Sequence, residues 1–349
     1  MNTNFDCDIV NGLSNALGGR VDLLEKMLGL KVRENLRYSD IQKIVKSGFA
    51  SEFFDLGDEI MTTYTATDGT EYDFPWLVVD FRDVYWENDP NPHPGMVLQA
   101  KYATAEKVTF DAAEDTIVDP EIEQTAQEGW YYYGDSNGVY DNLRLNVGDA
   151  IPFGNYSSIH KTGVDSNNSL TGGYNRYKFS AVRQWLNSNA DINEWWQSSH
   201  LGDVPPAELG ILKGFMAELS PDFASIIKET KVKTLAGGGN VDITYDKIFL
   251  PSVEEMYGTS DRDIEHAEGP YFQYWKEKTG LDSPDSSPNT GRIIASIDGT
   301  TDLPFCWLRT ALPPEGGYNN GSFGFMTGKV NGMVSDIIAL RVSPCCIIS

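Results

Sequence analysis

The C-terminal stretch from Asp302 to Ser349 constrains the fold more than any other part of this chain. It opens on an apolar run typical of a buried strand, Phe305 to Leu308, and it closes on a second apolar run, Ile337 to Ile348. Between these runs, Gly, Asn, Ser and Pro occur at a density that is typical of surface turns. The pattern predicts two buried strands that display an exposed loop, residues 315–336, on a rigid scaffold.

The expected loop also has the composition of a binding surface. Aromatic residues stand among Gly, Asn and Ser, a mixture that combines rigid contact area with adaptable hydrogen bonding. We therefore expect the ligand-binding residues to be Tyr318, Asn319, Asn320, Ser322, Phe323, Phe325 and Asn331.

Composition and charge exclude several classes of partner. A chain of 349 residues with 40% hydrophobic content can bury a large core. Its net charge of -24 repels nucleic acid and anionic lipid, and Lys and Arg form no cluster that would offset this charge locally. No stretch of about 18 apolar residues occurs, and the N-terminus lacks a secretory signal pattern. We expect no nucleic-acid partner, no membrane insertion, and synthesis in the bacterial cytoplasm.

The sequence favours a protein without catalytic residues, cofactor or metal. The four cysteines (Cys7, Cys306, Cys345 and Cys346) have no spacing typical of a zinc site or a disulfide framework, so we expect reduced core residues. The histidines are scattered and belong to no catalytic motif. The run from Trp86 to Asp89 resembles a calcium-lectin tripeptide but lacks a second loop of oxygen ligands. A carbohydrate-active enzyme stays open as an alternative, because 51 carboxylates always allow an acid–base pair to be chosen.

Hydrophobic periodicity divides the chain into three parts. Residues 1–50 carry apolar residues at helical spacing, with Ser39 as an expected N-cap and Gly48 as an expected helix end. This helical N-terminal module either packs on its own domain or mediates assembly, and we expect a homo-oligomer. Residues 51–155 read as a β-rich domain, with turns at Asp68-Gly69 and at the proline-rich segment 89–95.

The third part, residues 156–349, begins after a Ser, Asn and Gly-rich boundary. Helices are expected at 180–186, at 211–219 with a stop at Pro221, and at 251–257 with Ser252 as N-cap. Strands are expected at 226–234 and 242–250, and Trp185 and Trp307 are expected in the core. The fold class is therefore α+β.

An ordered set of motifs in this third part resembles an uncharacterised domain family that is common in phages and prophages of gut Firmicutes. The motifs are YKFSAVRQWLN (177–187), DKIFLPSVEEMYG (246–258), NTGRI (289–293), FCWLRT (305–310) and RVSPCCII (341–348). A leader segment, IQKIVKSGFASEFFDLGDEI (41–60) followed by WLVVDF (76–81), also resembles full-length members. Ala311 departs from the pattern, since most members continue from Ser or Thr directly to Pro.

The resemblance implies both a fold and a role. The family is similar to the C-type lectin-like fold of the formylglycine-generating enzymes, which includes variable proteins of diversity-generating retroelements. A C-terminal C-type lectin-like domain is therefore expected, on a virion structural protein. The implied role is recognition of a host cell-surface protein or glycan, or decoration of the particle, with other virion proteins as neighbours. The alternative function is that of a purely structural head or tail component without receptor activity.

Overall fold

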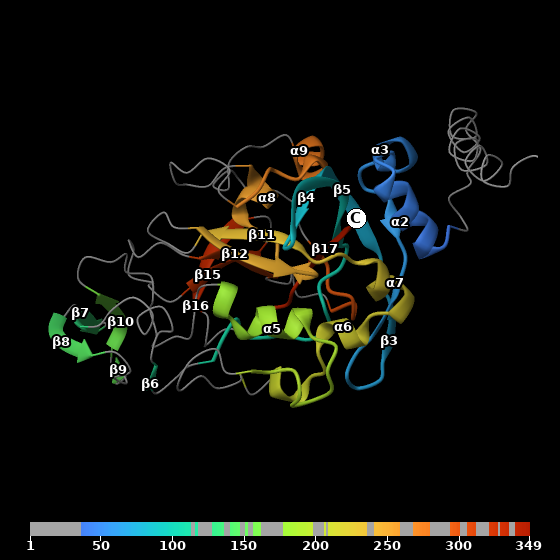
Figure 1. The fold of residues 1–349 in the computed structure, drawn as a ribbon. Coiled ribbons are helices and arrows are strands. Elements are labelled where there is room, and N and C mark those ends of the chain that lie inside the picture. Colours follow the sequence, from blue (N-terminus) through green and yellow to red (C-terminus); the bar gives the residue numbers. More distant parts are fainter. Residues whose placement is uncertain are drawn as a thin grey trace, which may run out of the picture.

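The computed structural model describes residues 36–112, 116–117, 128–135, 140–146, 151–152, 156–161, 177–197, 206, 209–235, 241–258, 268–279, 294–300, 306–311, 321–326, 329–334 and 339–349. These residues form both helices and antiparallel sheets, in line with the expected α+β class (Figure 1). The expected helical stripe before residue 36 lies outside the described residues.

The main sheet joins segments from both ends of the described chain. Its strand order is β1 (Glu59–Ile60), β4 (Trp76–Trp86), β5 (Asp89–Ala100), β17 (Cys345–Ile348) and β13 (Ile248–Phe249), and all neighbours are antiparallel. In Figure 1 the red strand β17 lies beside the teal strand β5. The expected boundary at residue 155 therefore does not separate two sheets, because strands from both sides of it are hydrogen-bonded neighbours.

Strand β5 includes the proline-rich segment that the sequence predicts to be a turn, so that prediction is wrong. Pro90, Pro92 and Pro94 stand at alternate positions, and alternate backbone N–H groups of a strand point to the same edge. Strand β17 pairs with Met96 to Gln99, so among the strands that the structure describes the proline-containing half of β5 has β4 as its one sheet neighbour. Prolines are tolerated at such an unpaired edge because no N–H is required there.

The other strands form small sheets. A hairpin joins β2 (Thr63–Thr65) to β3 (Glu71–Asp73), and a ribbon joins β11 (Thr230–Leu235) to β12 (Val241–Asp246). The turn expected at Asp68-Gly69 is confirmed, since Gly69 has a φ of +87°. One three-stranded sheet has the order β10 (Tyr156–Lys161), β7 (Glu128–Asp135) and β8 (Tyr140–Asn146). Another has the order β14 (Cys306–Ala311), β15 (Gly321–Met326) and β16 (Lys329–Val334). Strands β6 (Thr116–Ile117) and β9 (Ile151–Pro152) form a two-stranded pair.

The helices are short and cover the sheets. They are α2 (Tyr38–Lys46), α3 (Ala50–Phe53), α5 (Ala181–Asn187), α6 (Phe215–Glu218), α7 (Pro221–Ile226), α8 (Val253–Tyr257) and α9 (Gln273–Thr279), with 3-10 turns at Tyr177–Phe179 and Leu209–Ile211. Among the described helices, none combines the length and the apolar content that crossing a bilayer requires.

Helix boundaries follow the predicted caps in part. Ser252 caps α8 as expected, and Glu255 completes a capping box with it. Ser180, expected as the first residue of a helix, is instead the N-cap of α5. Gly48 has a φ of +80° just beyond α2, which confirms the expected helix end. Ser39, however, lies inside α2, because the helix starts at Tyr38 without a side-chain cap. Pro221 begins α7 rather than only ending a helix, since proline fits the first helical turn.

One contiguous apolar core connects these elements. It extends from Ile41 in α2 to Ile348 in β17 and includes Trp185 and Trp307, both fully buried as expected. Segments 100–108 and 340–344 also exchange backbone hydrogen bonds, among them Thr104 N to Val342 O at 2.9 Å. The described chain is thus held together by contacts between residues far apart in sequence.

Candidate functional site

The expected loop is only partly a loop. Tyr318, Asn319 and Asn320 lie outside the described residues. Ser322, Phe323 and Phe325 belong to β15 and Asn331 belongs to β16, so this half of the segment is a β-hairpin. Two residues, Thr327 and Gly328, connect the strands in sequence, and a glycine in such a short connection is a hairpin signal. Sequence analysis missed this hairpin because the high Gly and Asn content of the whole segment favoured a loop.

Strand register separates the expected residues into two groups. Phe325 pairs with Cys306 of β14 and with Val330 of β16, and Asn331 pairs with Gly324. Because successive positions of a strand belong to opposite faces, positions 323 and 325 share one face of the hairpin and positions 322 and 331 share the other. The expected residues on the hairpin therefore cannot all belong to one binding face.

Strand β14 fixes the base of this hairpin in the core. Trp307 donates its indole N–H to the carbonyl of Val108 at 2.7 Å and meets the ring of Phe110 edge-on, with 5.4 Å between ring centroids. Leu308 on the same strand is also fully buried. The hairpin is thus attached to a strand that has little freedom to move.

A buried arginine adds a second anchor to β14. Arg309 is 1% exposed and donates to Glu255 Oε2 at 2.5 Å and to the carbonyl oxygens of Leu250 and Glu268. Arg82 of β4 binds the other oxygen of Glu255 at 3.0 Å. Burial raises the pKa of Glu255, but the charges of Arg309 and Arg82 outweigh burial and hold that pKa below its usual value. The carboxylate therefore stays charged, and it links α8, β4 and β14.

Glu268 completes this polar centre from a different segment. Its Oε2 accepts from the hydroxyl of Thr310 at 2.6 Å and its Oε1 accepts from the backbone N–H of Leu235 at 3.0 Å. Burial raises the pKa of Glu268 to about 7, against the lowering effect of Arg309. All members of the centre bond to one another or to the backbone, which is typical of a structural network.

A second acidic pair lies at the hairpin β2–β3. The hydroxyl of Tyr64 is 2.7 Å from Glu106 Oε2 and 2.7 Å from Glu218 Oε2, and Thr67 donates to Glu218 Oε1 at 2.5 Å. A phenol has one proton, so one of the two carboxyls must carry a proton of its own to complete both bonds. Burial raises the pKa of Glu218 to about 7 and also raises the pKa of Glu106.

This acidic pair resembles a general acid–base arrangement but is placed for a structural role. Glu218 is 3% exposed, and both of its oxygens bond to hydroxyls of the chain. The pair joins β2, the segment around residue 106 and α6. Sequence reasoning missed it, because its partners are 42 and 154 residues from Tyr64 and carry no local pattern.

The described cysteines are reduced and buried, as expected for Cys306, Cys345 and Cys346. Burial raises the pKa of Cys306 to about 12 and the pKa values of Cys345 and Cys346 well above their usual value. A thiol in this setting is a poor nucleophile. Cys7 lies outside the described residues.

The carboxylate of Asp89, at the Trp86–Asp89 turn, is already bonded to neighbouring residues of strand β5. Asp89 accepts from the N–H of Asn91 and lies 2.9 Å from His93 Nε2, while the rings of Trp86 and His93 stack at 3.5 Å. Within the described ranges, no group of three or more His, Cys, Asp or Glu side chains is arranged to hold a metal ion.

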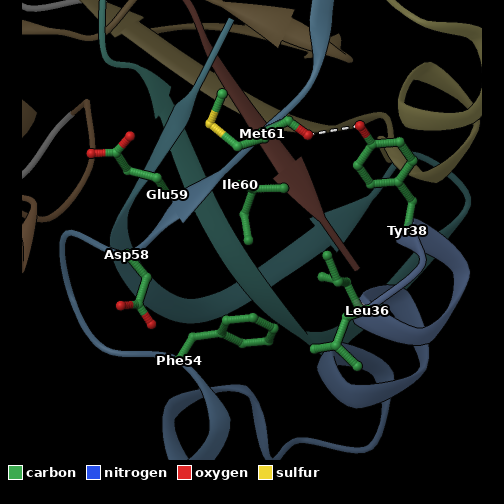
Figure 2. A pocket seen from close by; sticks show the side chains of 8 residues that line it. Leu36, Tyr38, Phe54, Asp58, Glu59, Ile60 and Met61 are labelled. Atoms are coloured by element: carbon green, nitrogen blue, oxygen red, sulfur yellow. Dashed lines mark hydrogen bonds between the residues drawn. The ribbon is translucent and has the colours of Figure 1, made fainter. Parts of the chain in front are cut away.

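A cavity of about 350 Å³, lined by apolar side chains together with Asp58 and Glu59, lies beside α2 (Figure 2). Leu36, Phe54 and Ile60 point into it, and the hydroxyl of Tyr38 donates to the carbonyl of Met61 at 2.7 Å. Glu59 lies at its edge, paired with Lys101 at 2.6 Å. Its lining suits packing by apolar side chains more than polar chemistry.

Comparison with known proteins gives a family but no activity. Residues 158–349 match the family described as Domain of unknown function (DUF6273). This match covers more than half of the chain, so the protein belongs to that family. No curated protein and no solved structure matches the chain. Strands β13 to β17 lie inside the matched region, whereas β1, β4 and β5 of the main sheet lie before it.

Proposed function

We propose that this chain is a non-enzymatic recognition protein of a phage particle, which presents hairpin β15–β16 to a protein or glycan on the host cell surface. The support is the motif resemblance together with one structural observation. Hairpin β15–β16 continues from β14, and β14 is held by Trp307 and by the buried pair Arg309–Glu255. A hairpin with a fixed base keeps its residues ordered before a ligand arrives, so less entropy is lost on binding.

The register of the hairpin narrows the binding face. Aromatic side chains carry a large share of the binding energy at most interfaces, and positions 323 and 325 share a face. Phe325 pairs with the fully buried Cys306, so position 325 is the one nearer the core. We therefore assign the main ligand contact to Phe323, with Tyr318, Asn319 and Asn320 as its neighbours in sequence.

Cell attachment of paired variants tests this assignment. Purified, fluorescently labelled protein would be incubated with a panel of gut Firmicutes isolates. We expect Phe323→Ala to weaken attachment about tenfold or more, since a central aromatic is worth about 2 kcal/mol. Asn331→Ala, on the same hairpin but on its other face, is the matched control and should attach normally. Both variants should melt within a few degrees of the unmodified protein, because surface changes cost about half a kcal/mol.

The other outcomes separate the competing functions. Normal attachment of Phe323→Ala would refute the hairpin face as the site. No attachment of the unmodified protein to any isolate would contradict recognition and favour a structural head or tail component. Release of reducing sugar from cell-wall glycans would favour a carbohydrate-active enzyme.

Virion components are usually symmetric oligomers, so we also propose a homo-oligomer next to other virion proteins. Phe49 and Met61 are exposed apolar side chains in the N-terminal part of the described chain, and Met61 lines the cavity beside α2. Static light scattering of the full chain should give a mass of two or more subunits. A monomer at all accessible concentrations would contradict this part of the proposal.

A further inference from the structure

A second cavity, polar and about 340 Å³ in volume, lies between α5 and β12, and no residue of hairpin β15–β16 is part of its lining. This volume is within the range of about 300–1,000 Å³ that small-molecule sites span. Its lining comes from α5 and α6, the end of β12, and the neighbouring residues Asn189, Glu229 and Lys247. Part of that lining belongs to the two sequence motifs at 177–187 and 246–258.

The inner wall of this cavity is rigid. Arg183 Nε donates to Asp246 Oδ1 at 2.8 Å, and the hydroxyl of Thr244 donates to Asp246 Oδ2 at 2.6 Å. Asn187 makes four hydrogen bonds, two as a donor to the carbonyls of Arg183 and Ile248 and two as an acceptor from the N–H groups of Lys247 and Ile248. These bonds connect α5 with the β12–β13 segment and fix the shape of the cavity.

Other side chains of the lining are available to a ligand. Within the described part of the chain, no hydrogen bond or ion pair engages the side chains of Glu229, Tyr245 and Lys247. Asn189 is exposed at the cavity, and Gln184 uses its carbonyl oxygen to accept from the N–H of Gln197. The cavity thus offers donors and acceptors in similar number, together with one aromatic ring.

The lining carries no net charge. Its positive side chains, Arg183 and Lys247, equal its negative ones, Asp246 and Glu229, in number, and Arg183 forms an ion pair with Asp246. Such a lining gives no net attraction to a ligand that carries a net charge. Amide and hydroxyl groups can pair with neighbouring hydroxyls of a ligand, and the ring of Tyr245 can cover an apolar face. An uncharged ligand with many hydroxyls has this complementary chemistry.

We propose that this cavity binds one unit of a neutral sugar. Lys247 and the side-chain amides of Gln184 and Asn189 donate to its oxygens, Glu229 accepts from its hydroxyls, and Tyr245 stacks on its ring. The site rests on the cavity alone and does not require hairpin β15–β16 to bind anything.

Ligand-observed NMR on the full chain tests the proposal. The probes are the methyl glycosides of galactose, glucose and N-acetylglucosamine, with glutamine as a zwitterion and glucose 6-phosphate as an anion. We expect saturation transfer to at least one neutral glycoside and none to glutamine or glucose 6-phosphate. Tyr245→Ala and Lys247→Met should each weaken binding about five- to tenfold, the value of one ring contact or hydrogen bond.

Matched controls keep the result interpretable. Tyr85→Ala removes another exposed tyrosine, outside the cavity, and should leave sugar binding unchanged. Phe323→Ala should also leave sugar binding unchanged, which separates this site from the hairpin. Tyr245→Ala and Lys247→Met should melt like the unmodified protein, because their side chains hold no described element in place. No transfer to any neutral glycoside, transfer to glutamine or glucose 6-phosphate alone, or transfer that survives both cavity variants would overturn the proposal.

Discussion

The proton held by the buried carboxyl of Glu218, beside Tyr64, makes the free energy of unfolding of this protein depend on pH in a defined direction. Burial raises the pKa of Glu218 from its ordinary value of 4.5 to about 7, so the folded chain holds a proton there that the unfolded chain has lost. A raised pKa in the folded state contributes stability that is fully present below pH 4.5 and is lost as pH rises through 7. Over that window the loss amounts to about 3 kcal/mol.

The variant Glu218→Gln removes this titration while keeping the hydrogen bonds. Glutamine resembles the protonated acid: its carbonyl can accept from Thr67 and its amide N–H can donate to the oxygen of Tyr64, which leaves the phenol proton for Glu106. The stability of the variant relative to the unmodified protein should therefore rise steadily from about pH 5.5 to about pH 8. About 2 kcal/mol of the difference should develop between about pH 5.5 and about pH 7.

Urea unfolding followed by tryptophan fluorescence measures this difference. Both proteins are compared across about pH 5.5 to pH 8, so that the titration of all other groups is common to both. Glu52→Gln, an exposed change in α3, is the matched control and should follow the unmodified protein throughout. Parallel stability curves for Glu218→Gln and the unmodified protein would show that Glu218 does not hold the proton.

Two further predictions concern the scaffold. Arg309→Met leaves Glu255 without its closest cation and should cost about 3–5 kcal/mol in urea unfolding, whereas Arg37→Met, which breaks a fully exposed pair with Asp40, should leave the unfolding curve almost unchanged. An equal loss of stability in Arg309→Met and Arg37→Met would show that the buried pair Arg309–Glu255 does not stabilise the fold. In a Cys7→Ser background, a thiol reagent should label no cysteine in the native protein and three in urea, because Cys306, Cys345 and Cys346 are buried with raised pKa values; rapid native labelling would contradict their burial.

Local sequence signals predicted the local structure well. Ser252 precedes an apolar run at helical spacing, and it caps α8 as expected. Trp185 and Trp307 have apolar neighbours, and both are fully buried. In these cases the determining contacts lie within a few residues, so the sequence contains the needed information.

Long-range pairing could not be predicted in the same way. Cys345 pairs with Gln99, and an apolar strand carries no mark of the partner it selects. Three prolines in β5 favoured a turn, and they are tolerated because no second neighbour pairs with that half of the strand among the described strands. The loop expected at 315–336 was partly wrong for a related reason. Gly324 lies between Phe323 and Phe325 in strand β15, but the high glycine content of this segment favoured a loop, and the pairing with β16 that makes it a strand is not visible in its composition.

The shared sheet leads to a prediction about where the chain can be divided. The family match begins at residue 158, close to the expected boundary at 155, yet β17 of the matched region pairs with β5, which lies before it.

Residues 156–349 produced alone would leave one edge of β17 unpaired and expose Cys345, Cys346, Ile347 and Ile348, which are all buried in the full chain. Exposing several such side chains costs about 1.5–3 kcal/mol each, and an unpaired apolar edge promotes aggregation. We therefore expect this fragment to be insoluble alone and soluble when co-expressed with residues 1–155, with both pieces eluting together in gel filtration. A full chain with a protease site inserted between residues 162 and 176 is the control, since cleavage there should leave the two pieces associated. A soluble monomeric fragment 156–349 with a cooperative unfolding transition would show that the boundary separates two independent folding units, in spite of the strands they share.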